Sequence, residues 1–136
     1  MSWTTVDLHG VNPNLEPIAA GDNYVFQLLG GTLEESGRLA AKAAIVSDGE
    51  FTGRKVFFSY PDPDKVEWAP RVLKRLEQAM GVDAIPGEDP AGYLNRAALS
   101  GARFGGRIFH ETYTPEGATE PKIQARLDIF TVRPAV

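Results

Sequence analysis

A short aromatic segment near the middle of the chain constrains the fold more than any other feature. Residues 53–60 read Gly-Arg-Lys-Val-Phe-Phe-Ser-Tyr; a glycine-rich turn at 48–53 precedes them and Pro61 follows them. A run of aromatic and β-branched residues between glycine and proline turns is typical of a β-strand. Two strand-like segments come before it, and a helix-like segment and two more strands come after it. The sequence therefore predicts the order β-β-β-α-β-β.

Alternation of side chains indicates the faces of the first three strands. The first strand covers 23–29 and is broken by Gly30-Gly31, and the second covers 37–46. In the second strand the residues at 39, 41, 43 and 45 point inward, and those at 38, 40, 42 and 44 point outward. Its alanines would also suit a helix, but the glycine turns on both sides favour a strand. In the third strand Val56 and Phe58 face inward.

Two further strands are predicted at 102–113 and 122–132, joined by a hairpin loop at 114–121. Gly105-Gly106 indicates a bulge or a strong bend in the first of them. In the second, alternation divides the side chains between two faces. Those expected to point inward are Ile123, Ala125, Leu127 and Ile129, and those expected to point outward are Lys122, Gln124, Arg126 and Asp128.

Spacings of three and four residues predict one main helix between the third and fourth strands. Its apolar stripe consists of Val66, Ala69, Leu73, Leu76 and Met80, the periodicity of an amphipathic helix. Pro70 must lie in the first turn, so the helix begins near residue 67 and ends before Gly81. Residues 82–101 hold a loop and then a short helix, which Asp89 would cap and Pro90 would open.

Five strands with a helix between the third and fourth are the element order of the OB-fold, a small Greek-key barrel. We therefore expect a mainly β (α+β) protein: a five-stranded OB-fold-like barrel with one helix between strands three and four. A chain of 136 residues fits one domain, so residues 1–136 form a single domain with an extended N-terminal arm at 1–21. A β-grasp variant or a small sandwich with a helical insert would have the same order.

The residue types leave little basis for catalysis. The chain contains no cysteine, which excludes disulfides and thiolate metal sites. It has neither the Lys-Ser/Thr of a phosphate-binding loop after its glycine pairs nor a Gly-x-Ser-x-Gly elbow. Asp62, Asp64 and Glu67 could form an oxygen-ligand metal site, but carboxylates before a helix are more often caps. We expect no enzyme activity, no metal and no cofactor.

Three segments resemble a family of small phage-encoded proteins. They are residues 19–24 (Ala-Ala-Gly-Asp-Asn-Tyr), 49–57 (Gly-Glu-Phe-Thr-Gly-Arg-Lys-Val-Phe) and 73–81, and the likeness extends over about residues 17–132. The family was long filed as a domain of unknown function, and its members are commonly described as single-stranded-DNA-binding proteins. The resemblance implies an OB-type fold, single-stranded DNA as the main partner, and replication or recombination proteins as further partners.

Single-strand binding requires cations near the phosphates and aromatic rings on which bases stack. In an OB-fold the main binding surface is the face of strands two and three with the neighbouring loops. Side-chain alternation directs basic and aromatic residues of the strands toward one side: Arg38, Lys42, Lys55, Phe57, Arg107, Phe109, Tyr113 and Arg126. Phe51 and Arg54 lie in the adjoining turn. Each ring could instead pack in the core or under the arm, and cations on a strand face are ordinary. Trp68 is expected at the edge of the core, and His110 near the barrel wall.

Two functional hypotheses remain. The first is non-specific single-stranded DNA binding in phage replication or recombination; the net charge of −4 argues weakly against it. The alternative is a protein-interaction or virion structural module on the same barrel, and a homodimer or higher oligomer is compatible with either. No secretory signal pattern and no bilayer-spanning apolar run are visible. We therefore expect no membrane association and a location in the cytoplasm, that of the host bacterium for a phage protein.

Overall fold

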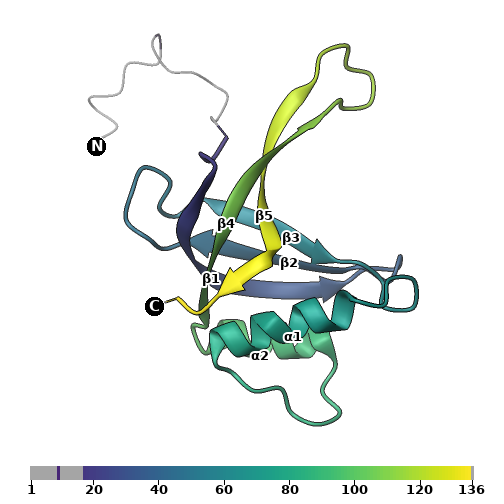
Figure 1. Cartoon of the computed structure of the whole chain (residues 1–136). Helices are drawn as coiled ribbons and strands as arrows, with labels where there is room; N and C mark the ends of the chain where they lie inside the picture. The colour runs from purple at the N-terminus through teal and green to yellow at the C-terminus, as the bar shows by residue number, and fades with distance from the viewer. Residues whose placement is uncertain (1–8, 10–16, 136) are drawn as a thin grey trace.

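The strands form one antiparallel sheet in the computed structural model, which describes residue 9 and residues 17–135. The elements are β1 (Gly21–Leu33), β2 (Leu39–Ile45), β3 (Lys55–Tyr60), α1 (Ala69–Met80), α2 (Pro90–Leu99), β4 (Arg103–Tyr113) and β5 (Lys122–Arg133). The five strands lie in the order β3-β2-β1-β4-β5 (Figure 1). The prediction of a mainly β fold with five strands is confirmed. Most of the predicted arm, residues 1–8 and 10–16, lies outside the described residues.

The strand order is that of a Greek key closed into a partly open barrel. β1, β2 and β3 follow one another as neighbours, and β4 returns to pair with β1, the spatial order 4-1-2-3 that defines a Greek key. β3 and β5 are the two edges of the hydrogen-bonded sheet, yet residues of these strands contact each other. The sheet therefore curls until its edges meet, as in an OB-fold.

Burial along β2 and β3 follows the predicted alternation. The side chains of Leu39, Ala41, Ala43 and Ile45 are buried, while Lys42 between them is exposed. In β3 the buried residues are Val56, Phe58 and Tyr60, and Lys55 and Phe57 are exposed. Three rings form the centre of the core: Phe104 lies 5.3 Å from Phe26 and 6.0 Å from Phe58, between ring centroids. The strand interpretation of 37–46 is confirmed over residues 39–45, and the helical alternative is wrong.

Two helices lie between β3 and β4, beneath the sheet in the view of Figure 1. α1 has Pro70 in its first turn and ends at Gly81, whose φ of 69° lets its backbone N–H bond the carbonyl of Glu77. α2 is the predicted short helix; the carboxylate of Asp89 accepts the N–H of Gly92. α1 packs against β5, β4 and β3, whereas α2 packs mainly against β1. The interval thus contains the predicted main helix and a second one that also covers the barrel.

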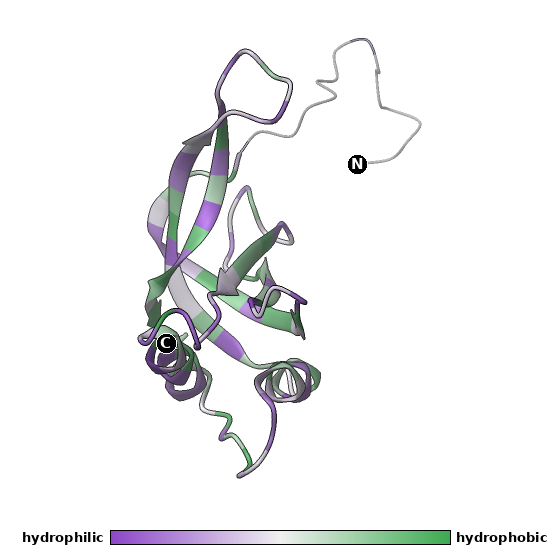
Figure 2. Ribbon diagram, turned by 90° about the vertical axis from the view of Figure 1, so that its right-hand side faces the viewer, coloured by the Kyte–Doolittle hydropathy of each residue, from purple (hydrophilic) through white to green (hydrophobic). Residues whose placement is uncertain are grey.

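The β4–β5 hairpin extends well beyond the barrel (Figure 1). Hydrophilic and hydrophobic positions alternate along it (Figure 2), and its loop spans residues 114–121 as predicted. Ile123 was expected to point inward, but 55% of its surface is exposed. The alternation there is right, since Ile123 pairs with Thr112 on the same face as Leu127 and Ile108. At this position the β4–β5 hairpin extends past the barrel, so the inward face of the hairpin is exposed to solvent.

Two other expectations concern glycines in strands. The register of β4 against β5 shifts between Gly105 and Arg107, in agreement with the bend predicted at Gly105-Gly106. The first strand, by contrast, was expected to stop at Gly30-Gly31, and this is wrong: β1 continues to Leu33. Among the described helices, none has the length and apolar character needed to cross a membrane.

Candidate nucleic-acid interface

The outward face of β2 and β3 carries cations beside an exposed ring. In the antiparallel register Lys42 lies opposite Phe57, and Ala44 lies opposite Lys55. Phe57, on the edge strand β3, has 68% of its surface exposed. Neither Lys42 nor Lys55 forms an ion pair with a carboxylate in the part of the chain that the structure describes. Positive charge and an aromatic surface are therefore available side by side.

A shallow groove of about 440 Å³ runs beside this pair, over β1 and β2. Its lining residues are Leu29, Gly30, Gly31, Thr32, Ala40, Ala41, Lys42, Phe57 and Asn95. Glycine and alanine make up much of the lining, so a flat group can approach the backbone closely. Lys42 is the charged residue of the lining and Phe57 its ring. The groove thus offers a low floor, one cation and one stacking surface.

Contacts with α2 explain why the glycine pair lies inside β1. The side-chain amide of Asn95 donates to the carbonyl of Gly31 at 2.9 Å, and its oxygen accepts the N–H of Gly31 at 3.1 Å. A Cβ on Gly30 would lie 2.6 Å from Asn95 Oδ1, and one on Gly31 would lie 2.5 Å from Leu94 Cδ1. Glycine is therefore required for α2 to approach the strand. The register shift against β2, between Leu28 and Gly30, falls at the same point.

A second hollow lies at the seam between β3 and β5. It measures about 140 Å³, and its lining includes Ser59 of β3, Phe109 of β4, and Arg126 and Phe130 of β5. Phe109 and Arg126 lie opposite each other in the β4–β5 register. Ser59 is two residues from Phe57 on the same face of β3, about 7 Å away. The groove and the seam hollow therefore flank β3 on its two sides.

An aromatic pair borders the seam hollow. The rings of Trp68 and Phe130 have centroids 5.0 Å apart at an interplanar angle of 53°. Trp68 is 42% exposed and Phe130 is 53% exposed, so both rings present surface to solvent. Trp68, expected at the edge of the core, thus contributes to an exposed aromatic surface. Phe130 was missed, although it has the same outward parity as Arg126 and Asp128.

Three of the predicted cations are neutralised by carboxylates. Arg38 pairs with Glu34 at 3.0 Å, Arg107 with Asp22 at 3.4 Å, and Arg126 with Glu111 at 2.9 Å. The hydrogen bond from Arg38 to Glu34 raises the pKa of Arg38. A phosphate must displace these carboxylates or share the cation with them, so these arginines are weaker phosphate ligands than Lys42 and Lys55.

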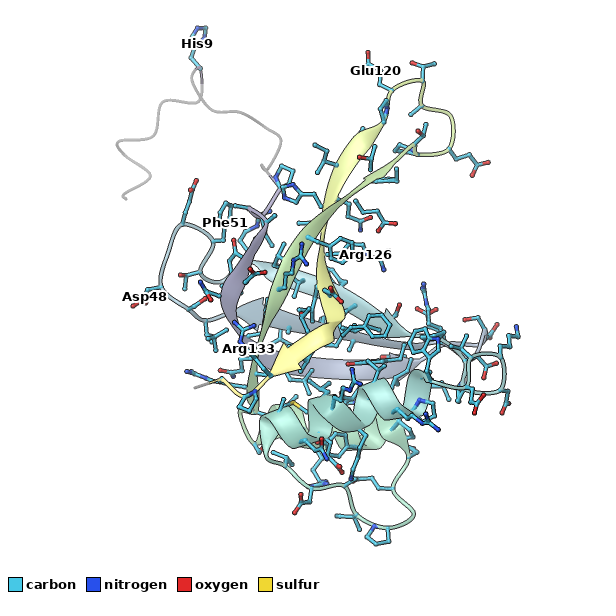
Figure 3. The ribbon with its side chains drawn as sticks, in the orientation of Figure 1. His9, Asp48, Phe51, Glu120, Arg126 and Arg133 are labelled. Carbon is cyan, nitrogen blue, oxygen red and sulfur yellow. The ribbon has the colours of Figure 1, made fainter. Side chains whose placement is uncertain are left out.

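The remaining predicted residues lie apart from the groove. Phe51 and Arg54 belong to the loop between β2 and β3, where the guanidinium carbon lies 5.9 Å from the ring centroid. Phe51 also packs against the core. Figure 3 shows Phe51 and Arg126 on opposite sides of the β4–β5 hairpin. Tyr113, which is 43% exposed, lies at the far end of β4. The ten predicted residues therefore do not form one continuous groove.

Asp62 and His110, considered for a metal site and a catalytic role, make local contacts. The side chain of Asp62 accepts the N–H of Asp64 at 3.0 Å, a turn contact before α1. Within residues 17–135 and at residue 9, no three His, Cys, Asp or Glu side chains are close enough to hold a metal ion. His110 bonds through Nε2 to the carbonyl of Ile18 at 2.8 Å. This bond attaches Ile18 to β4.

Comparison with known proteins gives no relative from which a function could be transferred: no family model, no curated protein and no solved structure matches the chain.

Proposed function

We propose that the protein binds single-stranded DNA, without sequence preference, across the outward face of β2 and β3. The observation that carries the proposal is the pairing of exposed Phe57 with Lys42 beside a groove floored by glycine and alanine. A base can stack on Phe57 while Lys42 and Lys55 neutralise phosphates. Stacking of this kind contributes about 1–3 kcal/mol per base and tolerates any base, since every base has a π-face.

The seam hollow extends the same surface across β3. A DNA strand that leaves the groove beyond Phe57 first meets Ser59 and next Phe109 and Arg126. It then reaches the rings of Phe130 and Trp68. These groups repeat the combination of rings and cations that single-strand binders use. The part of the path over β2 and β3 lies on the strands whose face binds oligonucleotides in OB-folds.

Of the residues that the structure describes, no acidic one lines the groove, although Asp128 lines the seam hollow beside Arg126. Among the residues that line the groove, Lys42 is the one with a charge. Many of the acidic side chains lie elsewhere, in the turns before α1 and α2: Asp62, Asp64, Glu67, Asp83, Glu88 and Asp89. Salt screens charges more than about 10 Å away at ordinary ionic strength, so distant carboxylates oppose binding weakly.

The resemblance to phage-encoded single-strand binders supports the same function. It rests on residues 19–24, 49–57 and 73–81, and these include the turn into β3 and the start of β1. In that role the protein would cover single-stranded intermediates of replication or recombination in the host cytoplasm. Binding alone would suffice, without catalysis.

A mobility-shift experiment tests the proposal. Wild type should retard an oligo-dT strand at low salt and retard the matching duplex much less. Lys55→Glu and Phe57→Ala should each weaken the single-strand complex. Equal affinity for the duplex, or no complex with oligo-dT at low salt, would contradict single-strand binding.

The projecting hairpin favours one alternative, a protein-interaction or virion structural module. β5 is an edge strand of the described sheet, and much of the hairpin stands outside the barrel. An exposed edge can pair with a strand of a neighbouring molecule. Light scattering separates the two functions: a large ordered assembly without affinity for oligo-dT would favour this alternative.

A further inference from the structure

The hydroxyl of Tyr60 is left without a hydrogen-bond partner in the interior. Tyr60 is the last residue of β3, and only 2% of its surface is exposed. Of the buried side-chain polar atoms in the described part of the chain, its oxygen is the one that lacks a partner. Burial raises the pKa of Tyr60, so the hydroxyl remains a protonated donor. An unmade buried hydrogen bond is costly, and native proteins rarely keep one without a reason.

Tyr60 forms part of an apolar cleft at one end of the barrel. The cleft measures about 310 Å³ and lies where the β1–β2 turn, the end of β3 and the first turns of both helices meet. Leucines and prolines dominate its lining. Leu33 belongs to β1 and Leu73 to α1, while Pro61 follows β3 and Pro90 begins α2. Leu33 is 63% exposed at this site. We refer to this site as the Tyr60 cleft.

Two carboxylates lie at the edge of the cleft. Asp89 lines the cleft, and Asp62 Oδ2 lies 2.5 Å from the position a Cβ on Gly37, another lining residue, would take. Each carboxylate accepts one backbone N–H, from Gly92 and Asp64 respectively. Neither forms an ion pair with any residue that the structure describes. The prolines of the lining have no N–H to donate.

These features determine the chemistry of an occupant. The apolar lining suits one large apolar side chain. The two carboxylates suit a positive charge next to it, and their remaining oxygens can accept backbone N–H groups. The Tyr60 oxygen is covered by its neighbours, so a side chain of the lining must move before a carbonyl of the occupant can accept the hydroxyl proton that the fold leaves without an acceptor. A peptide segment offers all four groups, because its carbonyls accept while its N–H groups donate.

We propose that the Tyr60 cleft docks a segment of a partner protein in which a large apolar side chain is adjacent to lysine or arginine. No residue lines both this cleft and the groove beside Phe57, so docking is compatible with DNA in the groove. The cleft does not depend on the DNA-binding function, and each can fail without the other.

Amide chemical shifts of the whole ¹⁵N-labelled chain provide the first test, with capped tripeptides as probes. Lys-Phe-Lys should give saturable shifts at Leu33, Gly37, Leu73 and Ala91. Lys-Ala-Lys lacks the apolar group and Glu-Phe-Glu reverses the charge, so each should bind about tenfold more weakly or worse. Equal binding of the three peptides overturns the proposal. Saturable amide shifts with free indole, when none of the three peptides binds, also overturn the proposal and indicate a small-molecule site.

Two variants and a control sharpen the test. Tyr60→Phe removes the orphaned hydroxyl, so it should raise the melting temperature and still weaken Lys-Phe-Lys binding by about threefold to tenfold. Leu33→Asp should abolish peptide binding and leave oligo-dT binding unchanged. Ile85→Asp changes a side chain that is 55% exposed and lies outside the cleft, so it should alter neither. Unchanged peptide affinity in Tyr60→Phe or in Leu33→Asp contradicts the proposal.

Discussion

Phe57 lies directly opposite Lys42 in the antiparallel pairing of β3 with β2, and both side chains face away from the core. The pair places an exposed ring and a cation at neighbouring positions of one sheet face. The proposed function rests on this pair, and the first two predictions concern its two residues.

Phe57→Ala should lower the affinity for oligo-dT by about tenfold or more, since one base loses its stacking partner. The side chain is 68% exposed, so the free energy of unfolding should change by less than about 0.5 kcal/mol. Fluorescence anisotropy measures the first quantity and urea denaturation the second. Ile85→Ala is the matched control, because Ile85 is also exposed but lies in the loop between the helices. Equal affinity losses in the two variants would mean that Phe57 is not a stacking surface.

Lys42→Gln should weaken the salt dependence of DNA binding. Each phosphate neutralised on a single strand contributes about 0.7 to the slope of log K against log salt. The variant should therefore have a slope smaller by about 0.7, measured by anisotropy at several salt concentrations. Lys65→Gln removes the same charge from the exposed turn before α1 and should leave the slope unchanged. An unchanged slope in Lys42→Gln would remove Lys42 from the interface.

Gly31→Ala should destabilise the fold by about 1–3 kcal/mol, because the added Cβ overpacks the contact with α2. It would lie 2.5 Å from Leu94 Cδ1 and 3.2 Å from the carbonyl oxygen of Ala40. Gly21→Ala places a Cβ 3.5 Å from Tyr24 Cε2, an ordinary contact, and serves as the control. Urea denaturation compares the two variants. Equal stability would show that α2 does not need the close approach to β1.

The carboxylate of Glu88 should make the free energy of unfolding depend on pH. Arg96 donates two hydrogen bonds to its carboxylate, each 2.8 Å long, and the N–H of Ile85 donates a third. The bonds from Arg96, and then the one from Ile85, lower the pKa of Glu88 from 4.5 to about 2. Because the folded-state pKa is depressed, the stabilisation is complete above the unfolded value and is lost as the pH falls from about 4.5 to 2.

Glu88→Gln should therefore be less stable than wild type at neutral pH, and the difference should shrink as the pH approaches 2. Urea denaturation over this range measures it. The pKa of Glu77 is also lowered, chiefly by its hydrogen bond with Lys74, so wild type alone cannot isolate one group. Glu116→Gln, an exposed change in the hairpin loop, controls for the loss of a charge. A difference between wild type and Glu88→Gln that does not vary with pH would contradict the assignment.

Features that depend on local pattern were predictable. The alternation in residues 39–45 and 55–60 placed each side chain on its observed face, because one face of a barrel strand must be apolar. The caps were equally local: Asp89 before Pro90 and Gly81 after Met80 terminate helices as their chemistry requires.

Features that depend on partners distant in sequence were not predictable. Gly30-Gly31 resembles a strand end, but β1 continues past it, paired with β2 and bonded to Asn95, 64 residues later. Asn95 has no signal of its own in the sequence. Likewise, Lys42 and Phe57 could be assigned an outward face, but their pairing depends on the register between two strands. The carboxylates that neutralise Arg107 and Arg126 also come from such pairings.

The most direct test of the account is an amide chemical-shift titration of the ¹⁵N-labelled protein with a short oligo-dT at low salt. Single-strand binding across β2 and β3 predicts that the largest shifts cluster at Gly30, Gly31, Lys42 and Phe57, and that they continue at Ser59 and Phe130. The absence of saturable shifts, or shifts confined to the helices and the Tyr60 cleft, would contradict it.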